Sequence, residues 1–357
     1  HETAETLPLR NFQQYMDWIS RLEKLDDVID QYIALANQGI ENQVMPPKVL
    51  MSRVLNQIKL QNVDSYINSP FYDAFEVLPD EISNQEQEQI REQAQITITN
   101  VVIPSYVKLL NFFENSYYPN CRDTIGISDI KNGSQYYELI ARQFTTTELT
   151  PDEIHNIGLS EVTRIKNEMF KIMDQVQWNG SFDEFLDFLR TDSQFYFETG
   201  EELFTEYLAT SKRIDPLLVK LFKDLPSMPY GLKPIPMESA PDTTTAYYQR
   251  PAADGSRAGY YYVNLYMPEV RPKYEIEALS LHEAMPGHHL QIAYTMELDL
   301  PNFRKYGGYT AFVEGWGLYA ESLGEDLGMY KDPYSKFGQL TYEMWRAVRL
   351  VVDTGMH

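Results

Sequence analysis

The sequence is poor in cysteine, in histidine and in positive charge. Its 357 residues include a single cysteine, Cys121, so an intrachain disulfide framework is excluded, and the count fits either redox compartment. Lysine and arginine number 30 against 52 aspartates and glutamates, which gives a net charge of −22. A chain this acidic is a poor candidate for binding nucleic acid or an anionic membrane surface.

Long apolar runs, repeats and leader segments are lacking as well. No apolar run approaches the ~20 residues that a membrane span needs, and no signal peptide, internal repeat or low-complexity tract is visible. Since 43% of the residues are hydrophobic, the chain can bury a full core. We expect one domain over residues 1–357, with a helical scaffold over about 1–224 and a β-containing half with the metal motif over about 225–357.

Helical periodicity dominates the chain outside one central segment. Apolar residues at helical spacing predict a helix from Leu9 to about Ala36 and further helices along the chain. Thr150-Pro151-Asp152-Glu153 combines an N-cap, a first-position proline and a capping box, so a helix should begin there and run to about Val176. The sequence is therefore mainly α.

The central segment has a different composition. Tyr247–Arg250 and Gly259–Asn264 are rich in β-forming residues and flank the turn residues Asp254-Gly255-Ser256, which predicts a small antiparallel sheet of two or three strands. An exposed edge of such a sheet could bind an extended peptide, or the hairpin could serve packing alone.

Histidine, scarce elsewhere, is concentrated in one stretch after this sheet. Three of the six histidines lie between His282 and His289, together with Glu283. A His-Glu pair on a helix is the first half of the zincin motif, in which the histidine ligates Zn²⁺ and the glutamate polarises the bound water. The position four residues after His282 is Pro286 instead of a second histidine. We therefore expect the helix to kink or bulge near Met285.

Two imidazoles compete for the second ligand position. On an undistorted helix, His289 returns to the face of His282, but about 10.5 Å further along the axis. That separation is long for two rings that share one Zn²⁺ with bonds of ~2.0 Å. His288 reaches the ion if the Pro286-Gly287 break turns it. We favour His288 and keep His289 as the alternative.

Carboxylates on a later apolar helix complete the candidate site. Glu314 stands among apolar residues 26 positions after His288, and we expect it to be the third ligand; its alternative role is charge near a helix N-terminus. Gly315 and Gly317 permit close helix packing. Glu321 lies on the same face and would orient a ligand imidazole, or else be a solvated surface carboxylate.

These residues predict a reaction. Two neutral imidazoles, one carboxylate and an open fourth position form the ligand set of a catalytic zinc site. With one Zn²⁺ bound, Glu283 would act as general base on the activated water and return the proton to the leaving amine of a peptide substrate. The alternatives are a non-peptide amidase and a non-catalytic helical binding protein whose histidines form a buried hydrogen-bond network. His1 and His155 are assigned structural roles.

The two motifs carry a family resemblance. His282 to Gln291 and Glu314 to Glu321 resemble H-E-x-x-P-G-H-H-L-Q and E-G-W-x-x-Y-x-E of the bacterial domain of unknown function 885 family. That family resembles the helical gluzincin metallopeptidases, in which a glycine precedes the second zinc histidine and a later helix carries the glutamate ligand. Gly287-His288 matches that order, so the resemblance implies a zincin-like fold and favours His288.

The resemblance also implies a location and a greater length. Members are frequently exported, often as lipoproteins, which implies an extracytoplasmic protein, periplasmic or membrane-anchored, with any lipid anchor outside this chain. They also continue past the terminal Asp353 to His357 segment, so the chain is expected to be a fragment lacking C-terminal helices. The sequence leaves the oligomeric state and the choice between endo- and exopeptidase open.

Overall fold

The computed structural model describes residue 4, residues 7–237 and residues 239–357, so His1 lies outside the described residues. The fold is mainly α, as predicted: 67% of the described residues are helical, and the one sheet among them has three strands. The chain divides into two compact units, His1–Gln135 with His357 (unit 1) and Tyr136–Met356 (unit 2). Both motifs lie in unit 2.

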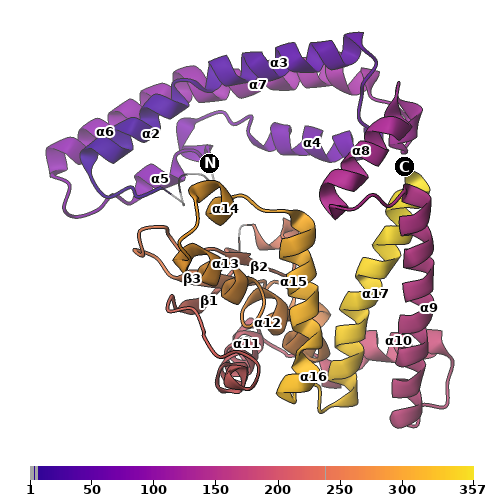
Figure 1. The fold of residues 1–357 in the computed structure, drawn as a ribbon. Helices are drawn as coiled ribbons and strands as arrows, with labels where there is room; N and C mark the ends of the chain where they lie inside the picture. Colours follow the sequence, from indigo (N-terminus) through magenta and orange to yellow (C-terminus); the bar gives the residue numbers. More distant parts are fainter. Residues whose placement is uncertain (1–3, 5–6, 238) are drawn as a thin grey trace. The chain divides into compact units, whose positions relative to one another are not determined.

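Unit 1 is a set of helices around one apolar cluster, to which α2 contributes Tyr15, Trp18, Ile19 and Leu22. The helix predicted from Leu9 to about Ala36 is in fact two helices. The chain turns at Glu23 and Lys24, and the acidic residues that follow favour the start of a new helix. From residue 7 onward, the α-helices of unit 1 (Figure 1) are α2 (Phe12–Leu22), α3 (Leu25–Glu41), α4 (Lys48–Leu60), α5 (Asp73–Glu76), α6 (Asn84–Thr97) and α7 (Ile103–Phe112).

One helical stretch of unit 1 is notable for its length. Asn84–Asn120 is continuous through two π-turns, and an 18-residue window in it has a mean hydropathy of 1.3, enough by length and composition to cross a membrane. Core helices of soluble proteins, which are mostly buried, reach such values as well. Here Ile90, Ala94 and Ile98 line one face and pack into the cluster of unit 1, while 28% of the window is buried.

Unit 2 begins within α8 and contains the longest helix pair. Its helices are α8 (Gly133–Thr145), α9 (Pro151–Gln175), α10 (Phe182–Thr191), α11 (Gly200–Ile214), α12 (Ile276–Glu283), α13 (His288–Glu297), α14 (Asn302–Tyr306), α15 (Thr310–Ser322), α16 (Gly324–Leu327) and α17 (Pro333–Met356). The capping box predicted at Thr150 opens α9. His155 on α9 hydrogen bonds to Thr354 on α17, and Arg164 pairs with Glu343, so the two helices run antiparallel (Figure 1).

The sheet precedes the motif helix in the chain. Its strands are β1 (Tyr230–Pro234), β2 (Ala246–Gln249) and β3 (Gly259–Val263), in the order β1-β3-β2. The predicted pairing of β2 with β3 is antiparallel, as expected, while β1 adds a parallel partner on the other edge of β3. On β3, Gly259, Tyr261 and Val263 alternate inward, so one face of the sheet packs on the core of unit 2.

Helix α12 is the centre of unit 2. Seven of its eight residues are buried, because α11, α15, α17 and β2 surround it (Figure 1). Its apolar residues Ile276, Ala278, Leu279 and Leu281 lie on more than one side of the helix, which suits a helix surrounded by other elements. Its C-terminal residues are His282 and Glu283, so burial of the helix fixes where this His-Glu pair lies.

Candidate metal centre

The motif helix stops and restarts at the proline. Helix α12 ends at Glu283, Ala284 leaves helical geometry with φ −99° and ψ −109°, and α13 begins at His288. The predicted kink is therefore a complete break, since Pro286 has no N–H to continue the helical bonding. Gly287 is required there, because a Cβ atom at this position would lie 1.8 Å from the carbonyl oxygen of His282.

This break brings His288 beside His282. Their ring centroids are 4.6 Å apart at 83° to each other. Glu314 on α15 lies opposite both rings: Nε2 of His282 is 3.5 Å from Oε2, and Nε2 of His288 is 3.7 Å from Oε1. The three donor atoms lie within 4.8 Å of one another. A tetrahedral ion with bonds of about 2.0–2.1 Å has ligand atoms roughly 3.4 Å apart, so the donor set fits such an ion.

Two residues of the motifs hold α15 against the break. The indole N–H of Trp316 donates to the carbonyl oxygen of Pro286 at 2.8 Å, and the side-chain amide of Gln291 donates to the carbonyl oxygen of Phe312 at 3.1 Å. The two bonds reach α15 at Phe312 and Trp316, two residues before and two residues after Glu314. They therefore fix the carboxylate relative to the two imidazoles.

Two side chains contact the Nδ1 nitrogen of His282. Its Nδ1 lies 2.8 Å from Oε1 of Glu321, which is 1% exposed, and 3.2 Å from a guanidinium nitrogen of Arg346 on α17. A carboxylate only accepts, so Nδ1–H donates to Glu321, and in the neutral ring the lone pair then stands on Nε2, on the side of Glu314. Gly317 lets α15 approach: a Cβ atom there would be 2.4 Å from Cε1 of the ring. Gly315 has no such role, since a Cβ atom there would meet nothing within 4 Å.

His289 faces away from this cluster. Its Nε2 donates to the carbonyl oxygen of Met228 at 3.0 Å, and its Nδ1 accepts from the hydroxyl of Tyr248 on β2 at 2.8 Å. The ring also lies against Tyr230 of β1, with centroids 4.9 Å apart. Because the only lone pair of the neutral ring is already used, His289 joins the sheet to α13 and has no donor left for an ion.

The charges of the cluster are strongly coupled. Burial disfavours the charged form of His282, but the hydrogen bonds with Glu314 and Glu321 outweigh it and raise the pKa of His282 to about 9. Burial and the neighbouring positive charge of His282 lower the pKa of His288 to about 4. The hydrogen bond with His282 lowers the pKa of Glu314. Without an ion, the site is thus held by an ion pair between His282 and Glu314.

Glu283 completes the cluster without joining its hydrogen bonds. It is 8% exposed, and no hydrogen bond reaches its carboxylate from the described residues. Burial raises the pKa of Glu283 to about 7, partly offset by the positive charges of His282 and Arg346. A carboxylate with such a pKa both accepts and returns a proton at neutral pH.

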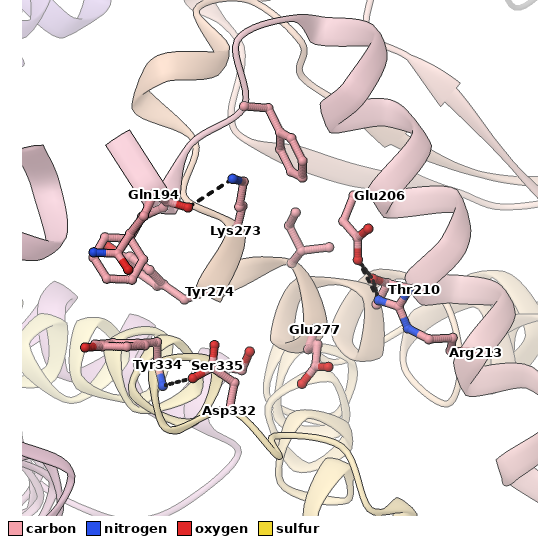
Figure 2. A pocket seen from close by; sticks show the side chains of 13 residues that line it. Gln194, Glu206, Thr210, Arg213, Lys273, Tyr274, Glu277, Asp332, Tyr334 and Ser335 are labelled. Carbon is pink, nitrogen blue, oxygen red and sulfur yellow. Dashed lines mark hydrogen bonds and ion pairs between the residues drawn. The ribbon is translucent and has the colours of Figure 1, made fainter. Parts of the chain in front are cut away.

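A pocket elsewhere in unit 2 contains none of the predicted site residues. It has a volume of about 550 Å³ and lies at the other end of α12, beside Glu277 (Figure 2). Its charges have protein partners: Glu206 pairs with Arg213, and Lys273 donates to the carbonyl oxygen of Gln194. The chemistry of the His-Glu cluster, and not the volume of this pocket, therefore marks the candidate site.

The structure thus brings together His282, His288 and Glu314, with Glu283 beside them and Glu321 behind His282. Arg346 also contacts this cluster, although no pattern in the sequence pointed to it. Its partners lie 64 and 25 residues away in the chain, on other helices, and no local spacing rule connects them.

Comparisons with known proteins agree with the fold. Residues 1–357 match a family described as "Bacterial protein of unknown function (DUF885)". The crystal structure of a "putative lipoprotein" from Colwellia psychrerythraea superposes on 98% of the chain with a TM-score of 0.93 and 31% sequence identity. No curated protein matched the sequence.

A second solved structure is more distant. It is a "putative lipoprotein of unknown function" from Shewanella oneidensis, which superposes on 97% of the chain with a TM-score of 0.60 at 18% identity and supports the fold alone. The chain spans 62% of the length of each of these two proteins.

Proposed function

Because the chain belongs to the bacterial DUF885 family, whose function is unknown, its activity has to be inferred from its own residues, and we propose that it is a zinc-dependent peptidase. His282, His288 and Glu314 would hold one Zn²⁺, and Glu283 would be the general base. The observation that carries the proposal is the convergence of two imidazoles and one carboxylate within 4.8 Å, with an acid-base carboxylate next to them.

Charge balance supports a divalent ion. When an ion binds, His282 gives up its proton and both imidazoles are neutral; with Glu283, Glu314 and Glu321 as carboxylates, Arg346 then compensates one of three negative charges. Two negative charges then remain in a site whose histidines are buried, and buried charge is costly unless paired or metal-bound. A divalent cation neutralises the remainder, and a set of two imidazoles with one carboxylate suits zinc in a catalytic site.

The chain's own residues supply the proton transfers. Zn²⁺ bound here would act as a Lewis acid and lower the pKa of a water molecule. Glu283, with its pKa raised by burial to about 7, takes a proton in the attack step and gives it to the leaving amine. Glu314 is 53% exposed at its side chain, so a substrate reaches the cluster from that side.

The same arrangement supports a relationship to the gluzincin peptidases. In that group a glycine precedes the second zinc histidine and a glutamate on a later helix is the third ligand. Gly287-His288 and Glu314 on α15 occupy the corresponding places. We also propose an extracytoplasmic location, periplasmic or membrane-anchored, on the ground that both solved relatives are described as lipoproteins.

The test measures metal and cleavage together. Wild type, Glu314→Ala and the control Glu325→Ala, which removes an exposed carboxylate paired with Lys336, are incubated with Zn²⁺, dialysed and analysed for metal, then given a mixed peptide library. We expect about one zinc per chain in wild type and control, little in Glu314→Ala, and peptide cleavage that a chelator stops and Zn²⁺ restores.

Other outcomes would contradict the proposal in distinct ways. Wild-type protein without zinc after incubation would point to a metal-free binding protein. Bound zinc with no cleaved peptide would point to a non-peptide amidase.

A further inference from the structure

The two imidazoles of the candidate metal centre, His282 and His288, differ in the partners of their Nδ1 nitrogens. Nδ1 of His282 meets Oε1 of Glu321, and that oxygen lies 3.4 Å from a guanidinium nitrogen of Arg346. Nδ1 of His288 is buried without a hydrogen-bond partner among the residues that the structure describes. Only the first of the two rings is therefore oriented by an outer network.

Arg346 is the cation of that network. Its side chain is 23% exposed, and one of its nitrogens is within 3.4 Å of both Glu321 and the ring of His282. Glu321 is 1% exposed, and a carboxylate buried to this degree is stable only with hydrogen bonds and an opposite charge. Within the described ranges, no other lysine or arginine contacts it.

Building on the function proposed above, we propose that Arg346 is a positioning residue of the metal centre. Its guanidinium holds Glu321 where the carboxylate accepts Nδ1–H of His282, so Nε2 presents its lone pair to the ion. The reverse arrangement would block ligation. If Arg346 donated to Nδ1, the single ring hydrogen would stand on Nε2.

Positioning and simple charge repulsion predict opposite effects for the loss of Arg346. Its positive charge repels a divalent ion, so removing that charge alone would tighten metal binding. Losing an outer partner that orients a ligand weakens metal binding by about 10- to 100-fold. The sign of the change in affinity therefore separates the two roles.

The experiment compares Zn²⁺ dissociation constants, measured by competition with a chromophoric chelator. Arg346→Gln should weaken binding by about 10- to 100-fold, and Arg346→Lys should recover part of the loss because it keeps the charge. The control is Arg349→Gln, from the next turn of α17, where the guanidinium lies over the ring of Trp345 at 4.8 Å. We expect the control to bind Zn²⁺ as wild type does.

A double-mutant cycle tests whether Arg346 acts through Glu321. In a Glu321→Gln background, Arg346→Gln should not weaken Zn²⁺ binding further, because the carboxylate that it holds is absent. A further loss as large as that in wild type overturns the proposal. Binding by the single variant that equals or exceeds wild type overturns it as well.

Two remaining outcomes are also decisive. If circular dichroism shows that Arg346→Gln does not fold, Glu321→Gln carries the test: the proposal expects weaker Zn²⁺ binding, and unchanged binding contradicts it. If wild type takes up no Zn²⁺, the proposed function itself fails. If wild type binds and Arg346→Gln binds equally, only the positioning role fails.

Discussion

His288 and His289 are neighbours in the chain, yet they belong to two different regions of unit 2. Both rings are buried, and burial lowers the pKa of each to about 4, so neither burial nor protonation distinguishes them. Their partners do. His289 has a hydrogen bond at each ring nitrogen and belongs to the sheet, whereas Nε2 of His288 faces Glu314. An inventory of hydrogen bonds thus identifies which of two similar residues can ligate an ion.

The largest expected effect is the loss of His288. His288→Ala removes one of three donors, so Zn²⁺ affinity should fall by more than the roughly 100-fold that loss of an outer partner costs, and peptide cleavage should be lost. Metal analysis after dialysis and single-turnover cleavage check this. Retained zinc and activity would mean that the ligand is elsewhere, and the comparison with His289 would fail.

The second largest effect is expected from Glu283→Gln, which should change catalysis and leave metal binding by His282, His288 and Glu314 intact. Glu283→Gln keeps the shape of the side chain but removes the base, so kcat should fall by about 10²- to 10⁴-fold. Zn²⁺ affinity should stay close to that of wild type, since Glu283 makes no hydrogen bond to the three donors. Steady-state kinetics beside chelator competition measures both, and near-normal kcat would exclude Glu283 as the base.

A smaller effect is expected on the sheet side. His289→Ala removes the bonds to Tyr248 and to the carbonyl oxygen of Met228, at about 1 kcal/mol each. The free energy of unfolding should therefore fall by roughly 2 kcal/mol or more, because a cavity adds to the loss. Denaturant unfolding measures the change, and zinc content should match wild type. A variant that keeps its stability and loses its metal would reverse the assignment of the two histidines.

The smallest expected effect is a pH dependence of metal binding that originates from His282. In the metal-free protein, burial is outweighed by Glu314 and Glu321, and the pKa of His282 is about 9. A ligating imidazole is neutral, so affinity should rise about tenfold per pH unit until about pH 9. His288 and His289 are already neutral at pH 7 and should release no proton.

Calorimetry in buffers of different ionisation enthalpy checks the proton count. At pH 7, Zn²⁺ binding should release about one proton from the imidazoles in wild type and in His289→Ala alike. A release near zero would mean that His282 is neutral before the ion binds.

Local chemistry was readable from the sequence. The start of α9 follows from Thr150, Pro151 and Glu153, because capping involves only neighbouring residues. The fold class follows from helical spacing in the same way. β1 was not predicted, since its partner β3 begins 29 residues later and parallel pairing leaves no turn signal between the strands.

The candidate site could be predicted from the sequence only in part. His282, Glu283 and Glu314 have recognisable residue types and spacing, but the choice of His288 over His289 depends on the backbone at Ala284 and Gly287. The sequence indicated a distortion there and not its direction. The contacts of Arg346 could not be predicted from the sequence, because they depend on how α17 packs against α12 and α15.

Of the three donors, Glu314 alone reaches the surface, with 53% of its side chain exposed. One exposed carboxylate gives an ion a path in and out while the helices that carry the histidines stay folded. An ion bound as proposed should then be exchangeable under native conditions: dialysis against a chelator should remove it, and Co²⁺ should take its place. The visible absorption of cobalt would report the coordination of the centre directly, without any substrate.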